Sequence, residues 1–247
     1  MFTLLATGPW TRPQIQTTWS DTSSHTITPE IQTVIDHEWS LASARSNIHL
    51  FDGPMCRLES FSTTPRELLL NLSPTSYKQF LGTNLSNANI ADHFGQQSLA
   101  NPVGLSVALF TTDDQLLLGR RSHNVAYYPD RVHPFAGALE PRDKSSVFAG
   151  ILRELHEELR LDENEIHDLV CLGLAQDNSL RQPELIFSAR TSRTTAEIHQ
   201  TLDTLEHRDL HAILADRASI ASAVSDSSLT PVAAAALSLV LSAGIHG

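Results

Sequence analysis

The sequence predicts an α/β fold in which a mixed β-sheet lies between helices, and three observations support this. Segments 103–110 and 115–120 are apolar and flank the polar residues 111–114, which is the pattern of a β-hairpin. Segment 146–161 carries Phe, Ile and Leu at helical spacing, so we expect a helix with one buried face. Segment 231–241 is almost entirely apolar and follows a threonine, so we expect a helix that is buried against the sheet.

The other elements follow from the spacing of apolar residues and from the turn residues between them. Thr28-Pro29 predicts the start of a helix, and Asp52-Gly53-Pro54 predicts a turn between two strands. The expected helices cover 29–42, 77–81 and 195–205. The expected strands cover 48–51, 55–61, 67–72, 132–138, 169–175, 184–189 and 210–214.

Charge restricts the class of partner. The chain has 247 residues and a formal net charge of −11. Binding of a nucleic acid polymer depends on Lys and Arg that neutralise phosphates, so this charge argues against such a partner. A small anionic nucleotide is still compatible, because a local basic cluster together with a metal ion is enough to bind it.

Cysteine usage and hydropathy indicate the compartment. Only Cys56 and Cys171 occur, with neither zinc-type spacing nor a disulfide framework, so we expect a reducing, cytoplasmic location. Segment 1–10 lacks the layout of a secretory signal. The apolar run 232–245 is shorter than the roughly 20 residues that cross a bilayer, so we expect no membrane partner.

The most informative motif is the stretch Arg153-Glu154-Leu155-His156-Glu157-Glu158. Its three glutamates stand at i, i+3 and i+4, which are neighbouring positions on a helix. Carboxylates held so close repel one another unless a counter-charge lies among them, and oxygen ligands suit Mg²⁺, with Mn²⁺ as the alternative. The competing interpretation is a solvated helix face in which Arg153 pairs with Glu157.

The residues before this helix add a glycine loop. Phe135-Ala136-Gly137-Ala138-Leu139-Glu140-Pro141-Arg142-Asp143 reads as a strand end followed by a polar loop. The order of strand, glycine loop and acidic helix resembles the Nudix box. This chain departs from that pattern in three ways: it has Asp143 where the family has Glu, nine residues between Asp143 and Arg153 where the family has seven, and Arg160 where the family has a second Gly.

Further blocks sharpen the resemblance. Segments 75–84, 101–104, 119–122 and 173–177 look like blocks of the Nudix-type UDP-glucose and UDP-galactose diphosphatases of animals and their plant and microbial relatives. The similarity extends over about residues 60 to 190. It implies a Nudix α/β/α sandwich with a mixed sheet. The first portion lacks the Nudix order of elements.

The domain organisation is expected to follow from this difference. We expect an N-terminal α+β extension over residues 1–100 that contributes to the nucleotide site. The Nudix hydrolase domain is expected over residues 101–247.

The resemblance also implies an activity. We expect Mg²⁺-dependent hydrolysis of the diphosphate bond of a UDP-sugar to UMP and a sugar 1-phosphate. Glu154 and Glu158 are the leading metal ligands, Glu157 is a third, and the backbone of Gly137 is an additional candidate. Arg153 is expected to hold the carboxylates in register. Glu157 and Glu184 are both open as the general base.

Residues outside the box are candidates for substrate binding. Arg120 and Arg121 carry the fork geometry that captures phosphate, although they are also compatible with a solvated strand end. Tyr77 is placed to stack on uracil or to pack in the core. Thr83 and Asn84 are candidates for hydrogen bonds to the nucleotide. Asp177 is a candidate for supporting the metal or the sugar, and a structural role in a turn is an equally good interpretation.

Two alternatives stay open at this stage. One is a Nudix enzyme that acts on ADP-ribose, coenzyme A or a dinucleoside polyphosphate. The other is a catalytically inactive Nudix-like domain that binds and senses a nucleotide sugar, which Arg160 and the longer loop favour. Either way the partner is a small molecule, and the sequence does not predict an oligomeric state.

Overall fold

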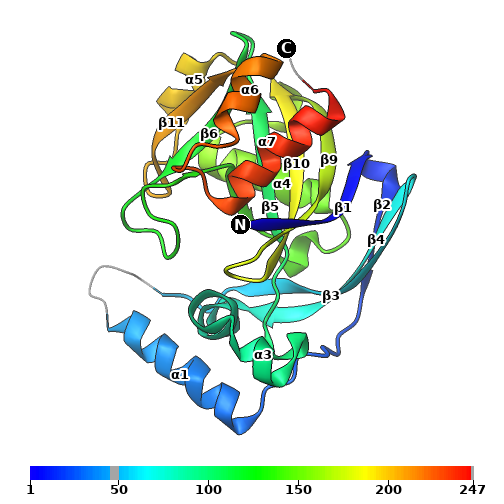
Figure 1. Cartoon of the computed structure of the whole chain (residues 1–247), viewed down its shortest axis with the longest axis vertical. Coiled ribbons are helices and arrows are strands. Elements are labelled where there is room, and N and C mark those ends of the chain that lie inside the picture. Colours follow the sequence, from blue (N-terminus) through cyan, green and yellow to red (C-terminus); the bar gives the residue numbers. More distant parts are fainter. Residues whose placement is uncertain (45–49, 246–247) are drawn as a thin grey trace.

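The computed structural model describes residues 1–44 and 50–245 and contains two β-sheets with flanking helices (Figure 1). Among these residues the larger sheet has eight strands in the order β1-β9-β10-β5-β6-β11, with β7 paired to β6 and β8 paired to β5. Strands β10 and β5 are parallel and the other pairs are antiparallel, so the sheet is mixed. Its strands are β1 (Phe2–Trp10), β5 (Gly104–Phe110), β6 (Gln115–Arg121), β7 (Val132–His133), β8 (Phe135–Ala138), β9 (Ile166–Asp177), β10 (Gln182–Thr191) and β11 (His207–Leu214).

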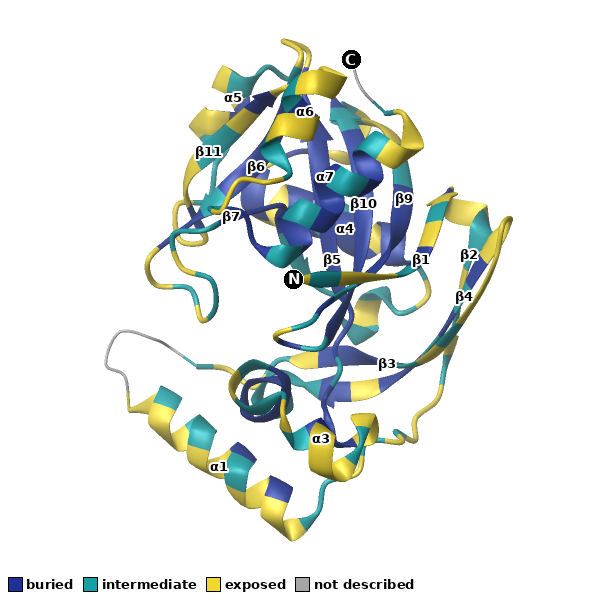
Figure 2. Ribbon diagram, viewed as in Figure 1, coloured by how far each residue is buried: buried dark blue, intermediate teal, exposed yellow. Residues whose placement is uncertain are grey.

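Helices cover both faces of this sheet. Leu105, Val107 and Leu109 of β5 share one apolar core with helix α4 (Val147–Leu159). The alternate residues Ala108 and Phe110 belong to a second core with helix α7 (Pro231–Ala243). Successive side chains of a strand point to opposite faces, so α4 and α7 sandwich the sheet, and both are buried where they meet it (Figure 2). The predicted α/β fold with a mixed sheet between helices is therefore confirmed.

Smaller helices complete the outer layer of this part of the chain. Helix α5 (Thr195–Thr201) packs near α4 and β11, and helix α6 (Arg217–Ala223) packs on α7. Helix α6 was not predicted, because its residues read as a polar stretch. Asp216 caps it by accepting hydrogen bonds from the backbone N–H groups of Ala218 and Ser219, both at 2.9 Å.

The N-terminal portion forms a second, three-stranded sheet in the order β2-β4-β3. Helix α1 lies beside it with an exposed outer face (Figure 2). The strands are β2 (Ile15–Trp19), β3 (Pro54–Thr64) and β4 (Glu67–Ser76), and the helices are α1 (Pro29–Ser43), α2 (Tyr77–Phe80) and α3 (Ile90–Phe94). A π-helical turn, Leu81–Leu85, continues α2.

The two sheets share one core. Leu68, Leu70 and Leu72 of β4 belong to the same apolar cluster as the α4 face of the large sheet. The backbone of Cys56 in β3 also accepts a hydrogen bond from Val103 N (2.9 Å) and donates one to Leu139 O (2.8 Å). Strand β1 belongs to the large sheet although it comes first in the chain. The division at residue 100 stays a prediction, and these contacts cross it.

Most predicted elements are present with shifted ends, and one is divided. The expected strand over 132–138 is two strands, because β7 pairs with β6 while β8 pairs with β5. Pro134 lies between them, and its missing N–H cannot take part in a strand ladder. The expected strand over 48–51 falls partly outside the described residues, and residues 50–51 lie in no strand.

Helix α4 ends at a residue in a conformation that favours glycine. Arg160 is the C-cap, with φ 57° and ψ 35° in the left-handed region. Its N–H donates to the carbonyl of His156 at 3.0 Å, as in a glycine-capped helix. The chain therefore carries Arg in a left-handed conformation that favours glycine, at the position where the Nudix pattern has Gly.

This geometry predicts that Arg160→Gly raises the free energy of unfolding by about 0.5–1 kcal/mol, because relief of left-handed strain exceeds the added chain entropy of the unfolded state. Urea unfolding would measure the change. Arg66→Gly is the matched control, since Arg66 is exposed and is not among the residues with positive φ. Equal effects at both positions would contradict the prediction.

Candidate functional site

A pocket of about 430 Å³ lies between the two sheets and is lined by half of the predicted site residues. The N-terminal portion supplies an apolar wall that consists of Met55, Tyr77 and Phe80. The large sheet and helix α4 supply the opposite, charged wall, which consists of Arg121, Gly137, Arg153, Glu154 and Glu157. The pocket therefore has an aromatic side and an ionic side.

Glycine at position 137 allows helix α4 to approach strand β8. A Cβ atom at Gly137 would lie 2.1 Å from the carboxyl group of Glu154. A side chain at position 137 would require the Glu154 carboxyl group to move, so the glycine lets this carboxyl group lie against the backbone of β8. A glycine at this position permits either a backbone turn or a close approach of another group, and in the structure the group that approaches is the Glu154 carboxylate.

Arg153 holds several carboxylates at once. Its Nη1 lies 2.7 Å from Glu154 Oε1 and 3.0 Å from Glu157 Oε2, and its Nε donates to Asp143 Oδ2 at 2.9 Å. Its Nη2 also donates to the carbonyl of Ala138 at 3.2 Å. Arg153 therefore ties the glycine loop to the helix despite the longer spacing between Asp143 and Arg153. Its contacts are those of a positioning residue.

The carboxyl groups of Glu154 and Glu158 lie where water is scarce. Burial raises the pKa of Glu154 to about 8, although Arg153 opposes the shift. Burial and then Glu206 raise the pKa of Glu158 well above its ordinary value, and Glu158 Oε2 accepts a hydrogen bond from Ala136 N at 3.2 Å. Oxygen donors with too little positive charge around them fit a hard divalent cation such as Mg²⁺ or Mn²⁺.

Glu157 differs from these two because half of its side chain is exposed. The side chain is 49% accessible and lines the pocket, and it pairs with Arg153 and with Arg142 Nη2 at 3.5 Å. Of the three predicted ligands, Glu154 and Glu157 reach the pocket wall. Glu158 lies behind them.

The side chains of Arg120 and Arg121 lie on opposite faces of the large sheet, because adjacent residues on a strand point to opposite sides. Arg121 is buried, lines the pocket and lies over the ring of Tyr127 at 4.5 Å. Its Nε donates to Tyr127 O at 3.1 Å. Arg120 instead donates to the carbonyl of Asp130 at 3.1 Å and does not line the pocket. Arg121 is thus the arginine placed to meet a ligand.

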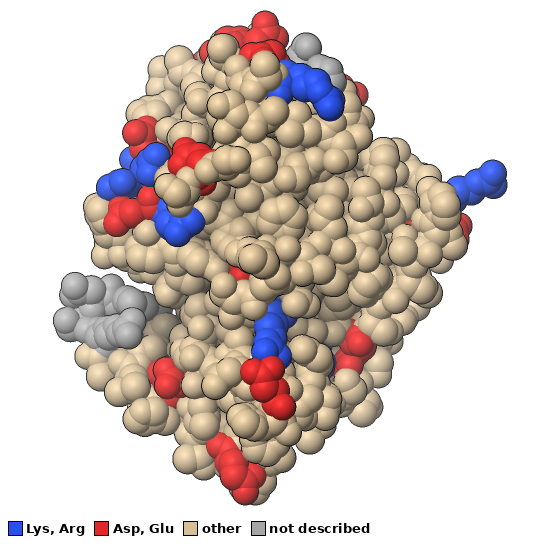
Figure 3. Space-filling model, viewed as in Figure 1, with Lys and Arg blue, Asp and Glu red and all other residues tan. Residues whose placement is uncertain are grey.

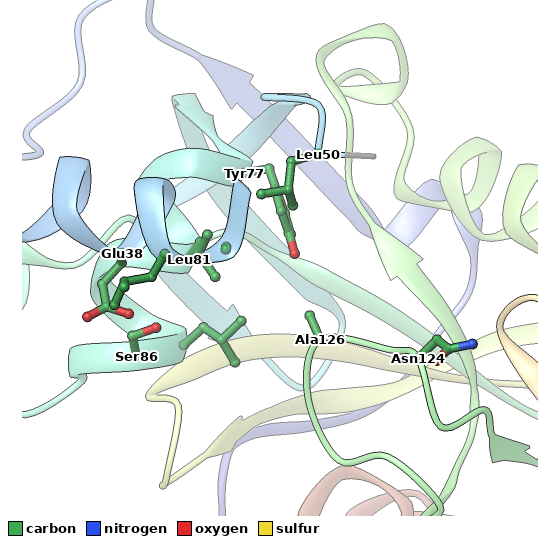
Figure 4. Close-up of a pocket in the computed structure, with 10 residues that line it drawn as sticks. Glu38, Leu50, Tyr77, Leu81, Ser86, Asn124 and Ala126 are labelled. Atoms are coloured by element: carbon green, nitrogen blue, oxygen red, sulfur yellow. The ribbon is translucent and has the colours of Figure 1, made fainter. Parts of the chain in front are cut away.

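Tyr77 lies between the main pocket and a second hollow of about 330 Å³. In Figure 4, Tyr77 and Leu50 face Ala126 and Asn124 across this second hollow, and Glu38 of α1 and Ser86 line its far side. Both Tyr77 and Ala126 line the two cavities, which therefore adjoin. The Tyr77 ring also packs edge-on against Trp39 at 6.4 Å, so it has both a packing contact and an accessible face.

Thr83 and Asn84 are fully buried and their polar atoms are engaged within the protein. Thr83 Oγ1 accepts from Ala100 N at 3.0 Å and donates to Gln79 O at 2.7 Å. The Asn84 side chain accepts from Asn101 N at 2.9 Å and donates to Leu180 O at 3.0 Å. The structure does not bring these two side chains into the pocket. They connect the π-helical turn to the chain that leads into β5.

Asp177 and Glu184 lie at the paired ends of β9 and β10, where both are buried. Asp177 accepts hydrogen bonds from the Tyr128 hydroxyl and from Ser179 N, both at 2.8 Å, so it has the partners of a turn residue. Burial raises the pKa of Glu184 to about 8, against the lowering influence of Ser106. Neither side chain lines the pocket.

Several pocket residues were missed by the sequence analysis. Tyr127, Gln182 and Glu206 line the pocket but lie in segments that carry no motif. Beside Glu206, burial and then Arg121 lower the pKa of His207 to about 4, so its ring is neutral near pH 7. These residues are far from α4 in the sequence and reach the pocket only through the tertiary fold. No spacing pattern could therefore have linked them to the acidic helix.

The described surface carries scattered charges, and both cysteines are buried. On the face shown in Figure 3, the described Lys and Arg side chains lie apart or beside Asp and Glu, and they form no continuous basic surface. Within residues 1–44 and 50–245, no helix is long and apolar enough to cross a membrane. Cys56 and Cys171 are both buried and free.

Comparison with curated proteins gives three informative relatives. The mouse uridine diphosphate glucose pyrophosphatase NUDT22 is 34% identical over 179 residues, which are 60% of this chain and 58% of the mouse protein. The human protein of the same name is 32% identical over 182 residues, which are 61% of this chain and 60% of the human one. Nudix hydrolase 9 of Arabidopsis thaliana is 21% identical over 229 residues, 76% of this chain and 73% of that protein.

These similarities confirm the resemblance to Nudix UDP-glucose diphosphatases. The chain spans about three-fifths of the length of the mammalian relatives. No protein-family model matches the chain.

The solved structures that resemble this chain have lower sequence identity to it than the mammalian relatives have. A Nudix-family hydrolase of Clostridium perfringens is 16% identical with a TM-score of 0.37, covering 57% of this chain and 98% of that one. A MutT protein of Methanosarcina mazei is 16% identical with a TM-score of 0.39, covering 56% and 90%. Neither likeness is close enough to assign a property to this chain.

The contact at Gly137 predicts the effect of a single added methyl group. Gly137→Ala should displace the Glu154 carboxyl group from Arg153 and lower the free energy of unfolding by about 1–3 kcal/mol. Urea unfolding would measure this. Gly53→Ala is the control, because a Cβ there meets only Phe51 at 3.6 Å, an ordinary contact distance. A loss no larger than that of the control would contradict the tight approach.

Glu184 predicts a pH dependence of stability. Its folded-state pKa of about 8 lies above the ordinary 4.5, so between these values the folded protein binds a proton that the unfolded chain has lost. The free energy of unfolding should therefore fall as pH rises through this window.

Glu184→Gln should remove this dependence and be more stable than wild type at pH 8.5 by roughly 2–4 kcal/mol, with little difference at pH 4.5. Urea unfolding at both pH values would test it, with the exposed Glu67→Gln as control. Parallel pH profiles for wild type and Glu184→Gln would show that the carboxyl group titrates normally.

Proposed function

We propose that this chain hydrolyses the diphosphate bond of a UDP-sugar such as UDP-glucose or UDP-galactose, with a divalent cation, and releases UMP and a sugar 1-phosphate. One observation carries the proposal: Glu154, Glu157 and Arg121 line the same pocket as the aromatic ring of Tyr77. A nucleoside diphosphate sugar offers the matching groups, an aromatic base beside a charged diphosphate. The names of the mammalian relatives support the uridine class of substrate.

The two adjoining cavities suggest how the substrate lies. Uracil would stack on the accessible face of Tyr77 in the hollow of Figure 4, and the diphosphate would lie in the main pocket. Arg121 would bind phosphate oxygens there, since its guanidinium is held from behind by Tyr127. This arrangement gives Tyr77 and Arg121 the binding roles expected of them, whereas Thr83 and Asn84 would support the wall.

The carboxylates would hold the cation. Mg²⁺ supplies charge neutralisation at the phosphate and lowers the pKa of a bound water. Glu154 and Glu158, with Glu157 as a third residue, are the candidate ligands, and Arg153 keeps Glu154 and Glu157 in register. Water attacks one phosphorus, the bridging P–O bond breaks, and a carboxylate takes the proton.

Accessibility favours Glu157 over Glu184 as the group that takes this proton. Glu157 is half exposed and lines the pocket. Glu184 is 6% exposed and lies outside the pocket. A general base must reach the water from which it removes a proton, directly or through one water molecule.

Purified protein incubated with UDP-glucose and Mg²⁺ should release UMP, which chromatography would detect. Glu154→Gln should slow the release by about 100-fold or more, because the amide cannot supply the charge that binds the cation. Glu163→Gln is the control, since Glu163 is exposed and contacts only the exposed Arg12 among the described ion pairs.

A substrate panel would separate the alternatives. ADP-ribose, coenzyme A and a dinucleoside polyphosphate should be cleaved more slowly than UDP-glucose, because Tyr77 and its hollow are assigned to uracil. Absence of UMP with every divalent cation, together with tight binding of UDP-glucose, would indicate a sensor and overturn the proposal.

A further inference from the structure

A second group of metal-ligating side chains lies beside the carboxylates of α4. Glu158, Glu206 and His207 each place one ligand atom within 4.8 Å of the others. They come from two distant parts of the chain, the last turn of α4 and the start of β11. Backbone hydrogen bonds fix these parts together, because Asp203 N donates to Glu158 O at 2.7 Å and His207 N donates to Asp203 O at 3.1 Å.

His207 is the unusual member of this group. Its side chain is 1% exposed, and neither ring nitrogen has a hydrogen-bond partner among the described residues. Buried polar groups are nearly always paired, so an imidazole without partners needs an explanation. Nε2 lies 3.4 Å from Glu158 Oε2, a contact that does not meet hydrogen-bond geometry. The ring thus faces a carboxylate without bonding to it.

The surroundings hold the imidazole in this orientation. Phe135 packs edge-on against it, with ring centroids 5.3 Å apart. On the other side, a Cβ atom at Gly119 would lie 2.1 Å from Nδ1, so the glycine provides the space that the ring occupies. Nδ1 therefore faces the strand backbone, and Nε2 faces the carboxylate. The packing on both sides leaves the ring little room to turn, so Nε2 is the nitrogen available to a ligand on the Glu158 side.

The group is accessible from the pocket. Glu206 is exposed and lines the pocket, whereas Glu158 and His207 are buried behind it. A cation that enters the pocket therefore meets Glu206 first and then the two buried ligands.

We propose that Glu158, Glu206 and His207 form a metal site with one nitrogen ligand that selects Mn²⁺, or a later first-row divalent ion, over Mg²⁺. Imidazole suits transition ions, whereas Mg²⁺ takes oxygen ligands. The inference deepens the proposed function, because Glu158 belongs to both ligand sets. It adds a nitrogen donor from outside the acidic helix and a preference among cations.

Pulsed electron paramagnetic resonance on the full chain with Mn²⁺ would test the site directly. We expect a hyperfine coupling to an imidazole nitrogen that changes to the ¹⁵N pattern when histidine is labelled. His207→Gln should remove the coupling, whereas His93→Gln, at an exposed histidine, should keep it. Absence of the nitrogen coupling in wild type would overturn the proposal.

Calorimetry would measure the selectivity. Wild type should bind Mn²⁺ about tenfold or more tightly than Mg²⁺, and His207→Gln should weaken Mn²⁺ binding by a similar factor with little change for Mg²⁺. If His207→Gln does not fold, Glu206→Gln decides, because this side chain is exposed: unchanged Mn²⁺ affinity would overturn the site.

Neither measurement needs substrate, so the outcomes for site and function are distinguishable. Nitrogen coupling without release of UMP would support the site and refute the proposed activity. Release of UMP without nitrogen coupling would refute the site alone.

Discussion

The guanidinium of Arg153 is the interaction on which the candidate site depends most. Three carboxylates on neighbouring turns would repel one another, and burial makes that repulsion more costly. Arg153 bonds to Glu154, Glu157 and Asp143, so it fixes the acidic face of α4 against the glycine loop. It does not reach Glu158, whose buried carboxyl group lies 3.4 Å from His207 and is influenced instead by the charge of Arg121. Glu154 and Glu157 are thus paired with Arg153, whereas Glu158 is not.

The sequence predicted the sandwich well because its central elements have clear hydrophobic patterns. Helix α4 buries residues at helical spacing, whereas β5 and β6 are almost continuously buried apolar runs separated by polar turn residues. Strand β1 was missed because it is an edge strand in which only Ala6 and Trp10 are buried. Pro134 is a local signal against one unbroken strand over 132–138, but the change of partner from β6 to β5 depends on tertiary pairing that the sequence does not reveal.

Some residues of the candidate site could be predicted from local spacing, and others could not. Glutamates on one helix face were recognisable from spacing alone, but the choice between Arg120 and Arg121 depends on which face of β6 is buried. His207 could not be connected to α4, because no short-range pattern joins residues so far apart. The departure at Arg160 looked like degeneration in the sequence. In the structure Arg160 adopts the left-handed conformation that favours glycine and ends α4 there, so the helix closes without the glycine.

The first nineteen residues join both sheets. Strand β1 pairs with β9 in the large sheet, and after a short turn β2 pairs with β4 in the small one, while Trp10 is fully buried between them. Moving the two sheets apart would strain the pairing of β1 with β9 or of β2 with β4, or expose the indole of Trp10. The two strand pairings and the buried indole therefore oppose separation of the two sheets, whose facing sides form the walls of the pocket.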